Sequence, residues 1–485
     1  MRRLQILLTG FAASVSLHVF ILTPLFALNS QVVKKQLIIR QNSTSSYAYS
    51  SGHDQSEHEL KTFANEAQKQ QFMEEECGRT VECEENQIYK ADEGYVSQSI
   101  IESTVAADPL AINQWSIVPS KKDFSSFGSV DIDVLRAWQI TRGKGRHRIY
   151  ILDSGGEFRA EPDLMDQYDV GYNAKVPSAS AQDDNSHGTH IAGIIGASGN
   201  NNYGIVGVMP GDSPSALQKF IVPIKFLDAN NQGDTDGVLR ALDIVSEDWN
   251  RTQPESCIIN MSFSGDKISQ AFQDKLNDLT RRKNCLVVTS AGNAGSNNDE
   301  KPTYPCNYSD RIPGVICVAA VDRNGQRAVF SNYGKKTVHL GAPGTDIYSI
   351  VPGKMIGSAF QSDYGPKSGT SQAGPQVAGV AGLIWSVNSK LSNVDVAQTL
   401  VSSVDRLPGL SNATSSGGQV NAYRAVLIAS GQDPSQADRF PQEGGGCSLS
   451  TEGASSNFYG LFLLIGLILI LSTILRSGLV RSKVE

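Results

Sequence analysis

Apolar and polar residues alternate in blocks through the middle of the chain. Several apolar runs are nearly continuous, as is typical of strands buried on both faces of a parallel sheet. These runs lie at 148–153, 220–227, 256–263, 285–290 and 314–321. Between them, 236–250 and 268–283 have the periodicity of amphipathic helices. The alternation predicts an α/β fold with a doubly wound, mostly parallel sheet flanked by helices.

The regions on either side of this pattern differ in composition. Residues 28–107 are polar and rich in Ser, Gln and Glu, which predicts weak structure in their first half. The α/β domain is expected over 108–430. Residues 431–457 are rich in Gly and Ser and are interpreted as a linker.

The first 27 residues have the pattern of an export signal. Arg2 and Arg3 precede an apolar run over 4–26, and the chain turns polar at Asn29. A charged start followed by an apolar run predicts a secretory signal peptide at 1–27. The run is also long enough to remain as an uncleaved membrane anchor, and the sequence leaves both outcomes open.

A second apolar run lies near the other end. Residues 458–475 carry no charge, and Arg476, Arg481 and Lys483 follow within 476–485. This run predicts a transmembrane helix, and the positive charge after it predicts a cytoplasmic end. A buried core helix is the alternative, which the position beyond the domain disfavours. We therefore expect an exported, membrane-anchored protein whose domain lies outside the cytoplasm, in the periplasm or at the cell surface, unless the tail is cut.

Charge and cysteine content narrow the partners and the compartment. The formal net charge is −7, so no basic surface indicates nucleic acid as a partner. Seven cysteines in an exported chain indicate disulfides with one thiol left over. Cys77 and Cys83 lie close together in the sequence, as do Cys306 and Cys317, whereas Cys257 and Cys285 each begin an apolar run. The pairing of these six cysteines stays open. The seventh, Cys447, is either a site of lipidation or processing or an unpaired thiol. With the Gly-rich 444–446 before it and the tail after it, it resembles a bacterial C-terminal sorting signal.

Three polar side chains stand where nucleophilic catalysis would place them. Asp153 ends an apolar run. His187 leads into the apolar helical stretch 191–195, and Ser371 precedes a small-residue helix at 377–387. Open α/β sheets hold their sites at the edge where strands end. Because a serine hydroxyl needs a base to take its proton and a carboxylate to orient that base, we expect these three side chains to form a catalytic triad.

The same chemistry needs a donor for the negative charge that develops on the substrate carbonyl. Residues 289–293 form a buried run that enters a turn of small residues, with the amide of Asn293 at its tip. This amide and the backbone N–H of Ser371 form a candidate oxyanion hole. Losing one such donor typically raises the barrier by about 2.7–4 kcal/mol.

The motifs at 149–155, 185–190 and 368–375, with the turn at 289–293, are similar to those of the subtilisin family of serine proteases. The likeness covers 108–429. The order of the motifs separates the chain from α/β-hydrolases, in which the nucleophile comes first.

The resemblance implies a serine endopeptidase that cleaves proteins through an acyl-enzyme intermediate. Asp153 would orient the base, and His187 would act as base and then as acid. Ser371 would attack the carbonyl, and Asn293 would hold the oxyanion. This catalysis needs no cofactor.

The resemblance also implies a strand-shaped substrate site. The peptide would bind by strand addition, with main-chain hydrogen bonds giving affinity and pockets giving selectivity. The residues implied are Ser262, Phe263, Ser264 and Gly265 on one wall of the primary pocket, Ser290, Ala291 and Gly292 on the other, and Gly233 and Asp234 along the far side of the substrate. Ser264 replaces a glycine of the family pattern, so the preference of this pocket does not carry over from the family.

The stretch 199–208 resembles the family's structural calcium loop. Oxygen-only ligands suit calcium. The match implies a structural Ca²⁺ held by side-chain oxygens of Asp163 and Asn201 and by the carbonyls of Gly199, Tyr203 and Ile205. An ordinary Asn/Gly turn is the alternative.

Upstream, 79–86 resembles the end of a subtilisin pro-segment, and 108–115 resembles the start of the mature domain. The resemblance implies that 28–107 is a pro-segment that assists folding, inhibits the enzyme and is removed by self-cleavage between about Lys90 and Asp108. The expected partners are therefore peptide and protein substrates, the chain's own pro-segment and the membrane.

Several residues near the motifs depart from the family pattern. Glu161 stands where a histidine is usual, and Gln372, Gly374 and Gln376 replace the usual Met, Ala or Ser, and His beside the nucleophile. None of these positions takes or gives a proton in the mechanism.

Three alternatives remain. His187 and His190 have the i, i+3 spacing of zinc ligands, but the sequence offers no third ligand with them. A non-catalytic binding protein of this fold would be indicated by an altered triad, and none of the three residues is altered. A structural cell-surface protein would have no use for the amide of Asn293.

Overall fold

A computed structural model describes most of the α/β domain and parts of the region before it. The described residues are 36–41, 58–75, 77, 81–85, 88–91, 108–118, 124–125, 128–159, 161–211, 219–356 and 359–437. The chain divides into two units, Met1–Phe440 and Pro441–Glu485. The predicted signal peptide, the apolar run 458–475, the basic tail and Cys447 lie outside the described residues. Within the described ranges, no helix is both long and apolar enough to cross a bilayer.

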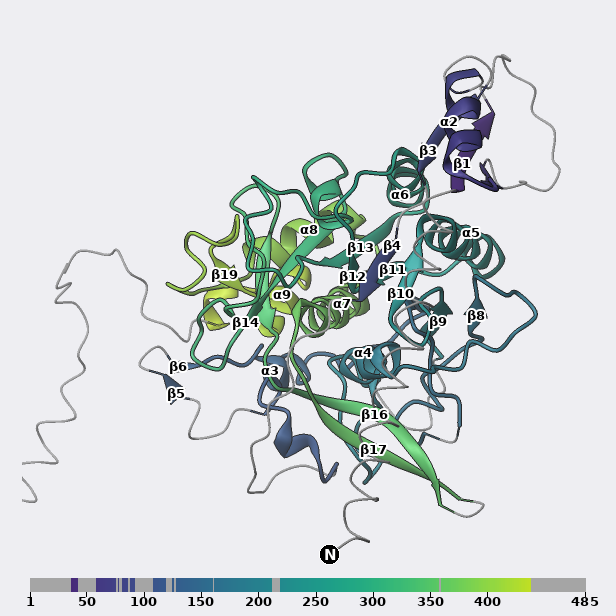
Figure 1. The fold of residues 1–485 in the computed structure, drawn as a ribbon. Coiled ribbons are helices and arrows are strands. Elements are labelled where there is room, and N and C mark those ends of the chain that lie inside the picture. The colour runs from purple at the N-terminus through teal and green to yellow at the C-terminus, as the bar shows by residue number, and fades with distance from the viewer. Residues whose placement is uncertain are drawn as a thin grey trace, which may run out of the picture. The chain divides into compact units, whose positions relative to one another are not determined.

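One large sheet organises the domain (Figure 1). Its strands are β7 (His147–Asp153), β8 (Tyr172–Asn173), β9 (Ile221–Lys225), β11 (Ser256–Met261), β13 (Cys285–Ser290), β14 (Val315–Val321), β15 (Leu340–Pro343), β18 (Asp405–Arg406) and β19 (Gly418–Gln419). Across the described residues the order is β18-β19-β15-β14-β13-β11-β7-β9-β8. Every neighbouring pair is parallel except β18 with β19 at one edge. All five apolar runs became strands of this sheet, which confirms the predicted fold class.

Both faces of the sheet are buried, which explains why the apolar runs are continuous. On β7, Ile149 and Ile151 belong to one hydrophobic core, whereas Tyr150 and Leu152 belong to the other. Successive side chains of a strand point to opposite faces, so each face must be apolar when helices cover both. Burial of this area supplies about 25 cal/mol per Å² of favourable free energy.

Helices lie on both sides of the sheet (Figure 1). They are α3 (Val134–Ala137), α4 (His187–Gly196), α7 (Thr370–Val387), α8 (Asn393–Ser402) and α9 (Ala422–Ala429) at the first core, and α5 (Thr235–Thr252) and α6 (Gln270–Arg282) at the second. The two predicted amphipathic stretches are α5 and α6. Side-chain caps set their starts, because Asp234 accepts from the N–H of Gly237 and Ser269 accepts from that of Phe272.

Some elements were not predicted from the pattern. A long antiparallel hairpin, β16 (Ile347–Ile356) and β17 (Ala359–Lys367), precedes α7. The sequence predicts that Ser371 precedes the helix. Helix α7 instead begins at Thr370, so Ser371 lies inside it. The start was hidden because Gly and Pro interrupt the helical pattern there.

The region before the domain contains its own small sheet. It consists of β1 (Gln36–Gln41), β2 (His58–Thr62) and β3 (Val81–Glu85) in the order β2-β1-β3, with α2 (Glu66–Glu75) between β2 and β3 in sequence. Strands therefore form in the half that composition marked as weakly structured, because backbone pairing does not require apolar side chains on both faces. The next strand, β4 (Ile88–Ala91), pairs elsewhere. Four further strands are short: β5 (Phe124–Ser125), β6 (Gly128–Ser129), β10 (Gln232–Asp234) and β12 (Phe263–Ser264).

Within the described residues, three disulfides join the six cysteines that the sequence analysis named, whose pairing it left open. They are Cys77–Cys83, Cys257–Cys285 and Cys306–Cys317. Cys257 and Cys285 are register partners at the starts of β11 and β13, so this bond links two neighbouring strands.

Candidate active site

Asp153 and His187 meet at the carboxyl edge of the sheet. Asp153 is the last residue of β7, His187 is the first of α4, and both are 0% exposed. Nδ1 of His187 lies 2.8 Å from Oδ1 and 3.0 Å from Oδ2 of Asp153. Nε2 of His187 is buried and has no hydrogen-bond partner among the described residues. The contact fixes the ring and leaves Nε2 available for a proton.

Asp183, which the sequence analysis did not single out, holds the turn before His187. Its carboxylate accepts hydrogen bonds from the N–H groups of Asn185, Ser186 and Thr189 and from the hydroxyl of Thr189. Burial pushes the pKa of Asp183 up, but these donors outweigh it and lower the pKa overall. Asp183 also accepts from the hydroxyl of Ser154, the residue after Asp153. Asp183 thereby links the turn before His187 to the residue that follows Asp153.

Ser371 lies in the first turn of α7 and contacts Ser262. Strand β12 begins one residue after Ser262. The hydroxyl of Ser262 donates to the carbonyl of Ser371 at 3.1 Å, and the hydroxyl of Ser371 donates to the carbonyl of Ser262 at 3.4 Å. In a regular helix the carbonyl of Ser371 would accept from the N–H of residue 375, but Pro375 has no N–H. The helix thus leaves this carbonyl to Ser262, which holds the backbone of Ser371, the predicted nucleophile, beside the strand predicted to bind substrate. Helices α4 and α7 pack against each other, which brings the starts of both to the same edge.

The side-chain amide of Asn293 is oriented by Thr370. The N–H and the hydroxyl of Thr370 both donate to Oδ1 of Asn293 at 3.0 Å. Nδ2 is therefore turned the other way, and it is buried with no partner among the described residues. A shielded donor with no acceptor beside a nucleophile is what an oxyanion hole requires. The preceding Gly292 has φ +102°, a conformation that suits glycine, and a Cβ there would lie 2.6 Å from Nδ2 of Asn332.

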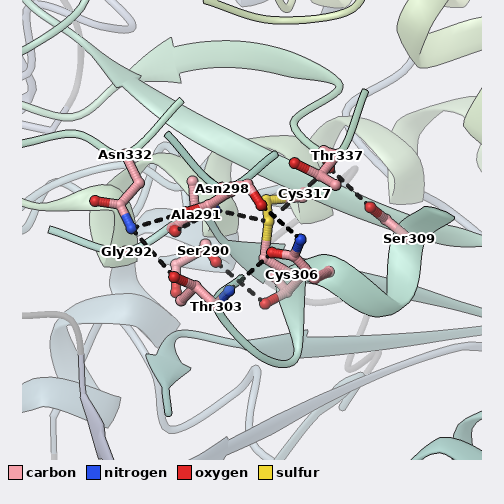
Figure 2. Close-up of a disulfide and its surroundings, with 12 residues drawn as sticks. Ser290, Ala291, Gly292, Asn298, Thr303, Cys306, Ser309, Cys317, Asn332 and Thr337 are labelled. Carbon is pink, nitrogen blue, oxygen red and sulfur yellow. Dashed lines mark hydrogen bonds between the residues drawn. A yellow bond between two sulfur atoms is a disulfide. The ribbon is translucent and has the colours of Figure 1, made fainter. Parts of the chain in front are cut away.

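Two asparagines hold this loop from behind, next to the Cys306–Cys317 disulfide (Figure 2). Oδ1 of Asn332 accepts from the N–H of Ala294 at 2.9 Å, and its Nδ2 donates to Oδ1 of Asn298 at 3.0 Å. Nδ2 of Asn298 donates to the carbonyl of Ala291 at 2.8 Å and to Sγ of Cys306 at 3.3 Å. The backbone on both sides of Asn293 is therefore tied to one buried network.

Several of the residues implied for substrate binding lie on β10 and β12, and β4 lies between these two strands. Strand β4 is antiparallel to β10 on one side and to β12 on the other. Tyr89 pairs with Gly233, and Lys90 pairs with Ser264. Asp234 pairs with Ile88. A segment of the chain thus lies where strand addition would place a substrate.

The other residues implied for the primary pocket lie near this sheet. Phe263 pairs with Ala91, and Gly265 forms an antiparallel bridge with Tyr304. Ser290 ends β13, and Ala291 and Gly292 continue from it toward Asn293. Ser290 and Ala291 are 0% exposed.

The residues implied for calcium come together only in part. Nδ2 of Asn201 donates to Oδ1 of Asp163 at 2.8 Å, and Oδ1 of Asn201 accepts from the N–H of Tyr203. Ile205 presents its N–H to Asp163 at 2.9 Å, where the resemblance implied its carbonyl. Gly199 lies at the start of the same loop.

Surplus negative charge is buried at the same place. Glu161 is 1% exposed, and its Oε2 has no hydrogen-bond partner in the described part of the chain. Burial raises the pKa of Glu161 and raises that of Asp163 to about 7. Tyr364 on β17 lies within hydrogen-bond distance of both carboxylates. An orphaned carboxylate oxygen beside a second buried carboxylate fits a cation. The described residues contain no group of three Asp, Glu, His or Cys suited to a metal, so amide and carbonyl oxygens would have to complete the ligands.

His190, the second histidine of the zinc alternative, contacts backbone. Its Nε2 lies 3.2 Å from the carbonyl of Gly365, and burial, with the charge of Lys367 nearby, lowers its pKa well below the usual value. These contacts are those of a neutral histidine that connects α4 to β17.

Comparison with known proteins agrees with this geometry. A model of the subtilase family matches residues 51–425. Thermitase from Thermoactinomyces vulgaris is 34% identical over 310 residues, which cover 64% of this chain and 99% of thermitase. Subtilisin-like protease 1 from Plasmodium falciparum is 32% identical over 321 residues, which cover 58% of this chain and 43% of that protein. Among solved structures, a protease from Pseudoalteromonas arctica superposes with a TM-score of 0.54 and 26% identity, over 67% of this chain and 100% of that one.

Proposed function

The chain belongs to the subtilase family, and on that premise we propose how its residues carry out serine endopeptidase chemistry. His187 takes the proton of Ser371 through Nε2, while Asp153 holds Nδ1 and stabilises the imidazolium that forms. Ser371 attacks the substrate carbonyl and forms an acyl-enzyme. His187 then gives the proton to the leaving amine, and a water molecule hydrolyses the ester by the same route in reverse.

Oxyanion stabilisation is the step that the structure supports most directly. Nδ2 of Asn293 is a buried donor without an acceptor in the described part of the chain, and Thr370 fixes its direction. An unsatisfied buried donor destabilises a fold by about 1–3 kcal/mol unless a ligand uses it. A protein that only bound peptides would have no reason to keep it, so this observation favours catalysis over the binding-protein alternative.

Labelling with a fluorophosphonate probe tests the proposal. The mature wild-type protein should be labelled, and the Ser371→Ala variant should not. Ser389→Ala, on the exposed loop after α7, is the matched control and should label like the wild type. Equal labelling of wild type and Ser371→Ala would overturn the proposal, as would no labelling of either.

We also propose that the protein is made as a zymogen in which 28–107 inhibits the enzyme. The support is the position of β4 between the two substrate strands, where it competes with any substrate for the same backbone hydrogen bonds. A separately added peptide spanning 28–91 should inhibit the mature enzyme. The same peptide with Tyr89→Pro, which removes a backbone donor opposite Gly233, should inhibit it less.

Export and membrane tethering are proposed from the terminal sequences together with the disulfides, which form in oxidising compartments. Deletion of 458–485 should move the enzyme from the membrane fraction to the soluble fraction. A protein that stays soluble with those residues present would contradict tethering.

We propose a structural Ca²⁺ held by Asp163 and Asn201 with loop carbonyls, because two carboxylates are buried there and Oε2 of Glu161 has no hydrogen-bond partner among the described residues. When bound, the ion would neutralise this charge and tie the 199–205 loop to the domain. Removing calcium with a chelator should lower the melting temperature of Ser371→Ala protein, which cannot digest itself, and Asp163→Asn should abolish that shift. An unchanged melting temperature would rule the site out.

A further inference from the structure

Asn332 is a buried residue behind the loop that carries Asn293. It lies between β14 and β15 in the sequence, and it is 2% exposed. Its side-chain oxygen accepts from two N–H groups, those of Ala294 at 2.9 Å and Ser296 at 3.0 Å. Its own backbone N–H donates to the carbonyl of Gly292 at 2.8 Å. Asn332 therefore fixes the backbone on both sides of Asn293.

The side chain of Asn332 is itself held in one direction. Its Nδ2 donates to Oδ1 of Asn298 at 3.0 Å and lies 3.4 Å from Oγ1 of Thr303 (Figure 2). Nδ2 of Asn298 in turn donates to the carbonyl of Ala291 and to Sγ of Cys306, which belongs to a disulfide. A flipped Asn332 amide would set its donors against the N–H groups of the loop, so only the observed orientation satisfies both of its ends.

Thr370 and Asn332 have different effects on the side chain of Asn293. Thr370 bonds to Oδ1 of Asn293, which sets the direction in which Nδ2 points. The distance from Nδ2 to a reacting carbonyl also depends on where the loop places the backbone of Asn293, and Asn332 bonds to that loop on both sides. An oxyanion donor acts within about 2.7–3.1 Å of the oxygen, so a small displacement of the loop would weaken it.

We propose that Asn332 is a positioning residue, which holds the loop so that Nδ2 of Asn293 stays within hydrogen-bond distance of the oxyanion. Asn332 does this without touching substrate. The inference rests on the proposed function, because it takes Asn293 as the oxyanion donor. It assigns part of the oxyanion stabilisation to a residue that lies outside the four sequence motifs.

The Asn332→Ala variant removes the acceptor for Ala294 and Ser296 and keeps the backbone bond to Gly292. Ala294 is exposed and Ser296 is half-buried, so water can take over the two N–H groups, and we expect the variant to fold. A misplacement of about 1 Å in an active site can cost about 10²-fold in rate, and we expect a smaller shift here to lower kcat about tenfold. KM should change less than twofold, because the contacts with the bound peptide remain. An unchanged kcat would overturn the inference.

Two further variants separate the acceptor from the stability of the loop. Asn332→Asp keeps an oxygen for both N–H groups and should retain most of kcat, although burial of the acid lowers the melting temperature. Asn297→Ala is the matched control, since Asn297 bonds to Glu300 and Asp299 outside this network, and it should leave kcat unchanged. A tenfold loss in either variant would contradict the assignment. Asn332→Ser, whose oxygen is one bond closer to the backbone, replaces Asn332→Ala in every comparison if the alanine variant does not fold.

A pair of inhibitors distinguishes positioning of the donor from a general loosening of the site. In a peptide aldehyde, Oγ of Ser371 bonds to the carbonyl carbon, the C=O electron pair moves onto the oxygen, and the serine proton passes to His187. The matching peptide alcohol binds without this reaction. Asn332→Ala should raise the inhibition constant of the aldehyde about tenfold and that of the alcohol less than twofold. Equal rises for both would show a merely structural role and overturn the inference.

The Asn293→Ala background provides the closing test. Removing the donor itself should lower kcat by roughly 10²–10³. Adding Asn332→Ala should then cause no further loss, because the donor that it positions is gone. A second tenfold loss in that background would overturn the inference and leave the protease intact. A wild-type protein that neither cleaves peptides nor labels with the fluorophosphonate probe would instead overturn the proposed function.

Discussion

Thr370 controls the direction of the Asn293 amide, because its N–H and its hydroxyl both donate to the same oxygen, Oδ1, at 3.0 Å. The hydroxyl also accepts from the N–H of Gly292 at 3.1 Å. The residue next to Ser371, the proposed nucleophile, thus sets which end of the amide would face the reacting carbonyl. An amide turned by 180° would present an oxygen to a developing negative charge, which would repel it.

Replacing Thr370 with Val should lower kcat, with little change in KM. Valine keeps the shape and the N–H of residue 370 but loses the hydroxyl, so Asn293 is held by one bond and not two. We expect a loss between about 10-fold and the roughly 10²–10³ that follows from removing an oxyanion donor. Thr370→Ser retains the hydroxyl and should keep most of the activity; steady-state kinetics on a peptide substrate provide the measurement.

Asp183→Asn should destabilise the fold by about 1–3 kcal/mol, because the new NH₂ group must face donors that the carboxylate now satisfies. The lowered pKa of Asp183 means that its stabilisation is present above the unfolded pKa near 3.8 and disappears as pH falls through the folded value below it. Urea unfolding of the Ser371→Ala protein measures the difference. Asp184→Asn is the control, since Asp184 is half exposed and forms an ion pair with Lys225; an equal effect of both changes would contradict a special role for Asp183.

His339 should make the domain less stable in mild acid. Burial lowers its pKa to about 4, and its Nδ1 accepts from the N–H of Cys317 at 3.2 Å. Below pH 6.5 the unfolded chain binds a proton that the folded chain refuses, so stability falls as pH drops from about 6.5 to 4, by at most about 1.4 kcal/mol per pH unit. His339→Asn keeps an acceptor for Cys317 and should flatten the curve over that range. Parallel curves for the two proteins would mean that His339 is not the cause.

Gly374→Ser should stabilise the domain by about 0.5–1 kcal/mol, because serine restricts the unfolded chain more than glycine does. A Cβ at residue 374 would lie 3.6 Å from Oδ1 of Asn260, an ordinary contact, and that oxygen is buried without a partner in the described residues. A serine hydroxyl could donate to it. Gly379→Ala on the same helix is the opposing control, since its Cβ would lie 2.7 Å from Cβ of Val208 and overpacking costs about 1–3 kcal/mol. Calorimetry that ranks the two variants in the reverse order would contradict the reasoning.

Local sequence identified five strands of the large sheet, the two amphipathic helices and the residues placed at the sheet edge. These features depend on short stretches of sequence. Strand β7 is apolar on both faces because helices cover both faces, and the polar Asp153 stands at its end. Sequence also predicted α/β topology from the alternation of strands and helices. It missed the β16–β17 hairpin, the start of α7 and the role of Asp183, because no periodic pattern marks them.

By itself, then, the sequence determined the fold class and the order of the motifs, and it predicted the reacting side chains, since each is written in neighbouring residues. Only the tertiary structure decided the direction of the Asn293 amide, the asparagine network behind it and the register of β4. Thr370 and Asn293 are 77 positions apart, and Asn298 and Asn332 are 34 apart. Contacts over such separations depend on how helices and strands pack in space, and a hydrogen bond changes with shifts of a few tenths of an ångström, which no local pattern of polarity encodes.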